Sequence, residues 1–144
     1  LAAMLRTARS RNVRLPAIVA SNAVFTREDP RDASLKAAFA EYPVREYEIL
    51  KQGGIRIGLF GLMGRDAAED APFAKPVTFA DTADRSKSVV ERLRNLEKVD
   101  LVVCLSHVGT TPVTSRSEDE RLAGKVPETT KIARSFFASF STSP

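Results

Sequence analysis

His107 is the only histidine of the 144-residue chain, and it stands two residues after the end of an apolar run. The run Leu101-Val-Val-Cys-Leu105 has the length and composition of a buried strand, so His107 falls near its carboxyl end. In open α/β sheets the ligand crevice lies beyond the carboxyl ends of the strands. A neutral imidazole there can bind a metal ion or act as a general base. The position alone leaves a second interpretation open, a hydrogen-bonded structural histidine at the end of a strand.

Neither Ser106 nor Cys104 is expected to act together with His107. Successive side chains of a strand point to opposite faces, so Ser106 and His107 diverge and do not form a nucleophile and its base. Cys104 is the only cysteine, and we expect a buried, unreactive thiol on the face of His107. One cysteine excludes an internal disulfide framework, and one histidine means that a zinc or two-metal site needs ligands from elsewhere.

Three glycines and one asparagine are the remaining candidates. Gly58, Gly61 and Gly64 form the pattern G-x-x-G-x-x-G, which is not the G-x-G-x-x-G fingerprint of dinucleotide sites. Close packing of a strand against a neighbour explains these glycines more simply, although a nucleotide-binding α/β domain that uses this strand stays open. Asn22 ends the short apolar run 17–21 at another carboxyl edge, where a turn residue is equally expected.

The order of the predicted elements indicates an α/β sheet. Gly53 and Gly54 separate two strand-like segments, which predicts a tight hairpin. Asp81 can cap a helix, and the succession of helix, strand and helix that follows is typical of parallel strands. The predicted helices are 2–12, 33–42, 82–98 and 118–126, the predicted strands are 17–21, 44–51, 55–63 and 101–106, and 64–80 is predicted to be rich in loops.

Charge and hydropathy limit the partners. The net charge of +4 arises in residues 1–14, which hold four arginines and no acid, because the rest of the chain has equal numbers of basic and acidic residues. A basic surface that follows phosphates is therefore not expected, and neither is a nucleic-acid partner. No apolar run approaches the ~18 residues of a membrane span. No signal peptide is visible, and the start at Leu1 suggests a chain cut from a longer one.

Several segments, in the same order, resemble the calcineurin-like metallophosphoesterases, in the branch of 5′-nucleotidases and UDP-sugar hydrolases. Residues 15–22 (LPAIVASN) resemble the fPvlsaN strand of that branch, and residues 54–62 (GIRIGLFGL) its GvkIGviGl strand. Residues 99–109 (VDLVVCLSHVG) are similar to its vDvvIaLSHlG segment and are the most specific piece. Residues 117–127 resemble the helix just beyond, so that the resemblance covers about residues 1–128.

This resemblance implies a partial α/β/β/α sandwich with a mixed sheet, which in the complete domain holds two divalent metal ions such as Mn or Zn. His107 matches a metal-binding histidine, and Asn22, Ser106 and Gly109 match positions near the site. No catalytic residue is carried over, and the substrate-binding residues stay unknown. The implied activity is hydrolysis of nucleotides or related phosphate esters in nucleotide catabolism, and the implied location is periplasmic or extracellular.

The family's other metal motifs, D-x-H, G-D, G-N-H-[DE] and G-H-x-H, do not occur in the chain. One imidazole cannot position two cations, so we expect a fragment that is inactive in isolation, with at most a partial site. A truncated or frame-shifted gene is our hypothesis. Residues 1–128 would form the incomplete domain, and 129–144, which have no acid and seven Ser or Thr, a divergent, poorly ordered tail without a strand. The alternative is a non-catalytic α/β binding or association module with a structural His107.

Overall fold

A computed structural model of the chain describes residues 1–26, 28–71, 75–108, 125 and 130–134. Helices and strands are mixed along the sequence, which confirms the predicted α/β class. The helices are α1 (Ala2–Ser10), α2 (Pro30–Glu41), α3 (Arg65–Glu69) and α4 (Thr82–Asn95). The strands are β1 (Ile18–Val19), β2 (Ala23–Val24), β3 (Val44–Arg45), β4 (Tyr47–Gln52), β5 (Ile55–Met63), β6 (Thr78–Phe79), β7 (Leu101–His107) and β8 (Thr130–Arg134).

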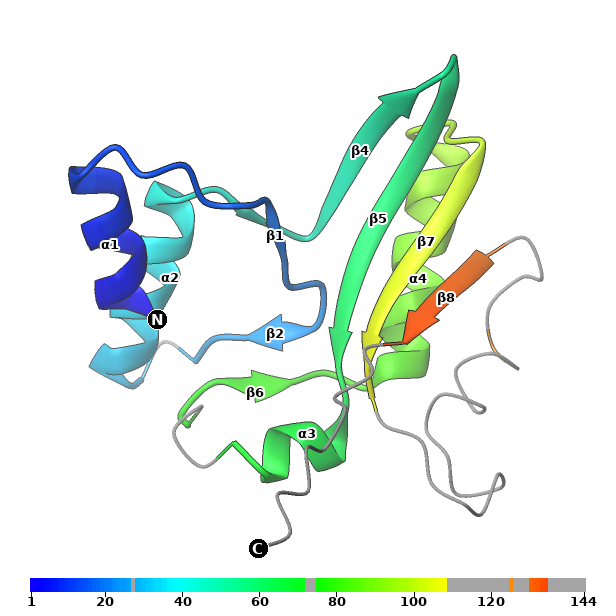
Figure 1. The fold of residues 1–144 in the computed structure, drawn as a ribbon. Coiled ribbons are helices and arrows are strands. Elements are labelled where there is room, and N and C mark those ends of the chain that lie inside the picture. Colours follow the sequence, from blue (N-terminus) through cyan, green and yellow to red (C-terminus); the bar gives the residue numbers. More distant parts are fainter. Residues whose placement is uncertain (27, 72–74, 109–124, 126–129, 135–144) are drawn as a thin grey trace, which may run out of the picture.

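A four-stranded sheet in the order β4-β5-β7-β8 is the largest unit of the fold (Figure 1). β4 and β5 are antiparallel, whereas β5, β7 and β8 run parallel to one another, so the sheet is mixed as expected. In this register Met63, the last residue of β5, lies opposite His107, the last residue of β7. The carboxyl ends of these two central strands therefore meet at one edge of the sheet.

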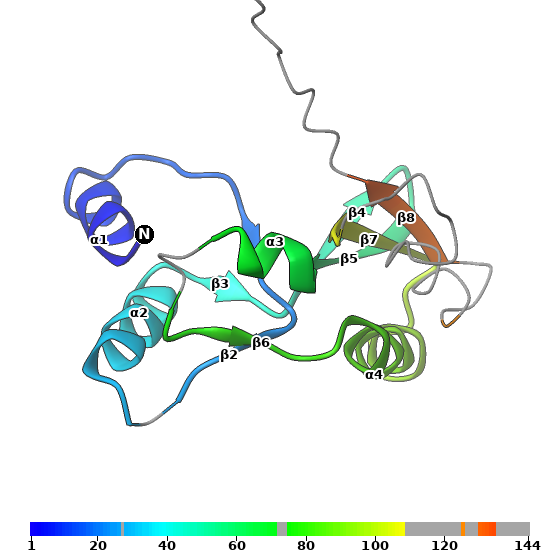
Figure 2. The same cartoon turned by 90° about the horizontal axis from the view of Figure 1, so that it is seen from below.

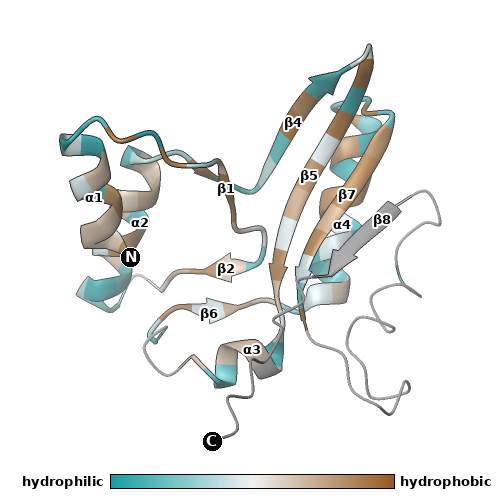
Figure 3. Cartoon of the chain, viewed as in Figure 1, coloured by the Kyte–Doolittle hydropathy of each residue, from teal (hydrophilic) through white to brown (hydrophobic). Residues whose placement is uncertain are grey.

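Helix α4 covers one face of this sheet and forms the core with it (Figures 1 and 2). The apolar character of β5 and β7 is visible along most of their length in Figure 3. Gly58 allows the helix to approach, because a Cβ at this position would lie only 2.8 Å from Cδ2 of Leu93. The buried core comprises Phe60, Leu62, Val89, Val90, Leu93, Val99, Val102, Cys104 and Val108.

Two local features form as predicted. The β4–β5 hairpin turns at Gly53 and Gly54, whose φ angles of 56° and 81° lie in the left-handed region that favours glycine. The side chain of Asp81 accepts hydrogen bonds from two backbone N–H groups in the first turn of α4. In both places the local sequence alone dictates the backbone conformation.

The N-terminal part of the chain forms smaller units. β1 pairs in parallel with β3, and β2 pairs antiparallel with β6. α1 packs on α2 and buries Leu5 and Ala8. α2 begins at Pro30, before the predicted start at residue 33, because Asp29 caps it and proline suits the first helical turn.

Several predictions differ from the structure. The segment 17–21, predicted as one strand, contains only the two residues of β1, and the chain turns at Ser21 and Asn22 before β2. The predicted helix 82–98 ends earlier, at Asn95, and Leu96, which directly follows it, is 73% exposed. The stretch 64–80, predicted to be rich in loops, contains α3 and β6.

The absence of a strand from residues 129–144 was a wrong prediction. Residues 130–134 form β8, which pairs in parallel with β7 along Val102–Ser106. This short strand lacks an alternating apolar pattern and is held by the ladder of its neighbour, which propensity does not reveal. Apart from residue 125, the predicted helix 118–126 lies outside the described residues, as do residues 135–144 of the predicted tail. Among the helices of the described part, none is long and apolar enough to cross a membrane.

Candidate functional site

His107 lies where the sequence places it, at the carboxyl end of β7. The backbone N–H of Gly64, the first residue after β5, donates a hydrogen bond to the carbonyl oxygen of His107 at 3.0 Å. The ends of β5 and β7 are thereby tied together one residue beyond the Met63–His107 pair. The backbone at His107 is fixed, and its side chain is half-buried.

A hollow of about 350 Å³, here called the imidazole hollow, borders this side chain. Leu105 and His107 line it from β7, and residues 17–20 line it from the opposite side. Leu105 and His107 are two residues apart in the strand, so both side chains lie on the face of the sheet that points away from α4. The imidazole therefore borders open volume, as a ligand-binding group must.

Asn22 also lines the imidazole hollow, and its own amide is fully engaged. The Nδ2 group donates to the carbonyl oxygens of Met63 and Ala80 at 2.8 and 3.0 Å, and Oδ1 accepts from the backbone N–H of Met63 at 3.0 Å. Asn22 is only 2% exposed. It lines the same hollow as His107, and it joins the end of β5 to the segment that follows β6. A place of Asn22 near a metal site stays a prediction from the resemblance.

Ser21 is a buried polar residue that the sequence analysis missed. Its hydroxyl donates to the carbonyl oxygen of Glu46 at 2.6 Å and accepts from the backbone N–H of Gly61 at 2.9 Å. Gly61 is needed there, because a Cβ would lie 2.9 Å from the carbonyl oxygen of Val19. The only sign in the sequence that Ser21 has a structural role was that two polar residues, Ser21 and Asn22, directly follow the apolar residues 17–20.

The other candidates near His107 have separate outcomes. Ser106 is 3% exposed and faces α4, so it diverges from His107 as predicted. Cys104 is buried as predicted, but it lies three residues before His107 and so faces α4 together with Ser106. The prediction that Cys104 shares the face of His107 was wrong, and Leu105 holds that position. Gly109 lies outside the described residues.

The described residues do not make a complete metal centre. Within residues 1–26, 28–71, 75–108, 125 and 130–134, no group of three or more His, Cys, Asp or Glu side chains lies close enough to hold a metal ion. A zinc site takes three or four protein ligands, and a two-metal site takes more. His107 is therefore not part of a group of three or more such ligands among the described residues, and its imidazole fits a single arm of such a centre.

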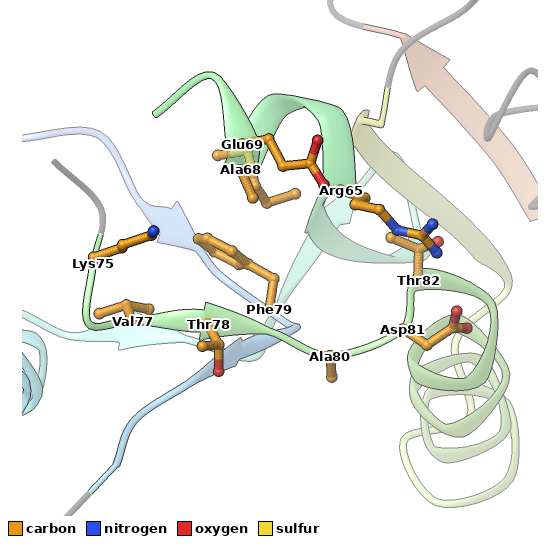
Figure 4. Close-up of a pocket in the computed structure, with 11 residues that line it drawn as sticks. Arg65, Ala68, Glu69, Lys75, Val77, Thr78, Phe79, Ala80, Asp81 and Thr82 are labelled. Carbon is orange, nitrogen blue, oxygen red and sulfur yellow. The ribbon is translucent and has the colours of Figure 1, made fainter. Parts of the chain in front are cut away.

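A second hollow of about 530 Å³, here called the charged hollow, lies next to the first. The two hollows share Met63 and Phe79 in their linings. Figure 4 shows Arg65 and Lys75 on two sides of the charged hollow, with the ring of Phe79 between them. The sequence analysis missed these residues because the stretch 64–80 has no regular apolar period.

Comparison with known proteins places this geometry in context. No family model matches the chain. The chain is 28% identical over 86 residues to the trifunctional nucleotide phosphoesterase protein YfkN of Bacillus subtilis. The aligned residues are 60% of this chain and 6% of that protein. It is 31% identical over 65 residues to a 5′-nucleotidase of Vibrio vulnificus. In this case the aligned residues are 44% of this chain and 12% of that protein.

The fold gives a longer match. A crystal structure of a 5′-nucleotidase precursor from Thermus thermophilus superposes with a TM-score of 0.66 and 28% sequence identity over 94% of this chain. The chain spans only 22% of that structure, and a smaller share of the two curated relatives. Sequence and fold together confirm the resemblance and the fold class that the sequence analysis stated.

Proposed function

Because this chain is related to the 5′-nucleotidase branch of the calcineurin-like metallophosphoesterases, we propose that it belongs to an enzyme that hydrolyses phosphate esters of nucleotides. The proposed role of His107 is to donate one imidazole nitrogen to a divalent metal ion. The observation that carries this proposal is the place of His107, at the carboxyl end of β7 and on the wall of the imidazole hollow.

In the complete domain, His107 would help to hold one of two divalent ions such as Mn²⁺ or Zn²⁺, whose chemistry would be to activate the attacking water and to stabilise the charge of the phosphoryl group. We assign no catalytic step to this chain, since its described residues hold no group of three or more metal ligands. Asn22 and Ser106 support the backbone near His107 in this proposal, and Gly109 follows it. The chain on its own is proposed to hydrolyse nucleotides very slowly.

The proposed partner is a nucleotide or a related phosphate ester, in a reaction of nucleotide catabolism. A nucleic acid is not proposed, because the excess of positive charge is confined to residues 1–14. By family resemblance, the proposed location is the periplasm or the outside of the cell.

A non-catalytic α/β module in which His107 is structural is the second candidate. It is favoured by one observation, the lack of an acidic or histidine cluster around His107 within the described residues. A nucleotide site on the glycine-rich strand is not favoured, because Leu93 occupies the space beside Gly58 and Val19 occupies the space beside Gly61.

Paramagnetic Mn²⁺ separates the two candidates. We expect Mn²⁺ to broaden the single Cε1–H proton signal of His107 at concentrations that leave exposed acidic residues unaffected. The control variant Asp100→Asn removes an exposed carboxylate at the opposite end of β7 and should leave this broadening unchanged. Broadening that follows the acidic residues and spares His107 would favour the structural role instead.

A further inference from the structure

The turn at Ser21 and Asn22 is connected to both sides of the imidazole hollow. Residues 17–20 directly precede this turn and line the hollow opposite His107. On the other side, the Asn22 amide binds both backbone groups of Met63, the register partner of His107. The position of the turn therefore affects both the wall that faces the imidazole and the strand end beside it.

One side chain of α4 reaches this turn. Nε of Arg85 donates a hydrogen bond to the carbonyl oxygen of Ser21 at 2.5 Å. Nη2 of the same guanidinium pairs with Oε1 of Glu46 at 2.7 Å, and the Ser21 hydroxyl donates to the carbonyl oxygen of Glu46 at 2.6 Å. The three residues thus form a closed set of contacts. Because the guanidinium is a rigid planar fork, it fixes its two partners relative to each other.

The carbonyl group of Ser21 belongs to the peptide bond that leads into Asn22. A hydrogen bond to this carbonyl holds the plane of the peptide, and with it the direction in which the Asn22 side chain leaves the backbone. Asn22 in turn binds the backbone of Met63. The next residue, Gly64, donates its N–H to the carbonyl oxygen of His107 at 3.0 Å. A contiguous series of hydrogen bonds therefore connects α4 to the backbone of His107.

We propose that Arg85 is a positioning residue of the candidate site, which sets the place of the His107 imidazole relative to the opposite wall of the hollow. Its charged donor makes the bond to Ser21 stronger than one between neutral groups, and its side chain is half-buried. As far as it concerns metal binding, this inference rests on the proposed function.

Arg92 is a matched control on the same helix. It lies about two turns further along α4 and pairs with the same carboxylate, that of Glu46, at 3.7 Å. Its guanidinium lies over the ring of Tyr47 and not at the turn. Arg85→Met and Arg92→Met each remove one positive charge from the surroundings of Glu46, so a difference between them reports the contact with Ser21.

Amide hydrogen exchange of the metal-free chain tests the positioning. In Arg85→Met we expect the amides of Met63 and Gly64 to exchange about tenfold faster, the loss of one charge-assisted hydrogen bond, while amides in the middle of β5 and β7 keep their rates. Arg92→Met should leave the Met63 and Gly64 amides unchanged. A uniform increase across the sheet, or equal increases in the two variants, would show that Arg85 only stabilises the fold and would overturn the proposal.

A double variant tests the route. Because the effect passes through Asn22, the Gly64 amide of Arg85→Met/Asn22→Ala should exchange no faster than that of Asn22→Ala alone. Effects of the two substitutions that multiply would mean that α4 acts independently of Asn22, and they would overturn the series of contacts proposed above.

Mn²⁺ titrations connect the positioning to the proposed function. We expect Arg85→Met to raise the Mn²⁺ concentration that broadens the Cε1–H signal of His107 by about threefold, and Arg92→Met to leave it unchanged. Broadening in the parent chain that is equal in Arg85→Met overturns the positioning role, while the metal role of His107 stands. If Mn²⁺ does not broaden this signal in the parent chain, the metal role fails, and amide exchange still decides whether Arg85 positions the edge of the sheet.

Discussion

At the scale of single residues, the amide of Asn22 organises the edge of the sheet where His107 lies. It satisfies both backbone groups of Met63 and the carbonyl oxygen of Ala80, all at distances of 2.8 to 3.0 Å. Because Met63 is the register partner of His107, these bonds act on the backbone that carries the imidazole. Asn22 is thus a positioning residue whose effect passes through β5.

The variant Asn22→Ala should lower the free energy of unfolding by about 1–3 kcal/mol, because it leaves buried backbone groups without partners. Urea denaturation measures this loss. Asn95→Ala, at an exposed asparagine that ends α4, is the matched control and should stay close to the parent chain. Equal denaturation midpoints for the two variants would contradict the role given to Asn22.

Two glycines of β5 differ in what surrounds them. A Cβ at Gly61 meets the backbone carbonyl of Val19 at 2.9 Å, whereas a Cβ at Gly58 meets the end of the Leu93 side chain, which can rotate. Gly61→Ala should therefore cost about 1–3 kcal/mol of stability, and Gly58→Ala less, since overpacking costs most where the neighbour cannot move. Thermal unfolding of both variants, measured side by side, checks this order, and a larger loss for Gly58→Ala would refute it.

At the scale of elements, a polar corner attaches β4 to the end of α4. The hydroxyl of Tyr47 donates to Oε1 of Glu97 at 2.7 Å, and the guanidinium of Arg92 lies 5.6 Å from the centre of the Tyr47 ring. Glu46, the residue before β4, pairs with Arg85 of α4 at 2.7 Å. These contacts fix the helix along the strand at two points.

The hydrogen bond to Glu97, together with burial, raises the pKa of Tyr47 above its ordinary value. The folded state therefore favours the protonated phenol, and this contribution to stability is complete below pH ~10, where the unfolded tyrosine also keeps its proton. It should be lost as the pH rises from there through the folded pKa. Urea denaturation on both sides of pH ~10 should show a steeper loss for the parent chain than for Tyr47→Phe. The same dependence of the unfolding free energy on pH in the parent chain and in Tyr47→Phe would contradict the stabilising role of the Tyr47 phenol.

The elements that the sequence predicts well are those with a strong local pattern. The apolar period of β5, β7 and α4 and the two glycines of the hairpin determine structure by themselves. β1, β2 and β6 have two residues each, and the hydrogen bonds that Ser21 and Asn22, between β1 and β2, make to distant residues such as Glu46 and Ala80 help to hold them in place. No periodicity reveals such bonds, and β8 depends on its neighbour in the same way.

The candidate site also has one part that follows from a local sequence pattern and one part that depends on contacts between distant residues. The place of His107 follows from a strand pattern and the general position of ligand crevices, so it could be predicted. The charged hollow is built from α3, β6 and the segments beside them, where Arg65 and Phe79 are brought together by the fold alone. Its residues carry no motif, so the sequence of this chain alone could not predict the charged hollow.

At the scale of the whole molecule, the chain spans about a fifth of the solved relative to which it is similar. Its described residues supply one imidazole and no cluster of acidic ligands around it. We expect phosphate release from adenosine monophosphate, with Mn²⁺ present, to stay at the level of the buffer. Turnover that is removed both by a chelator and by His107→Ala would show that the chain has a complete centre.

Met63 and Phe79 line both the imidazole hollow and the charged hollow. A molecule that shifts either side chain on entering one hollow alters the shape of the other. Thermodynamic linkage then makes the effect reciprocal, since the factor by which the first occupant changes the affinity of the second equals the factor by which the second changes that of the first.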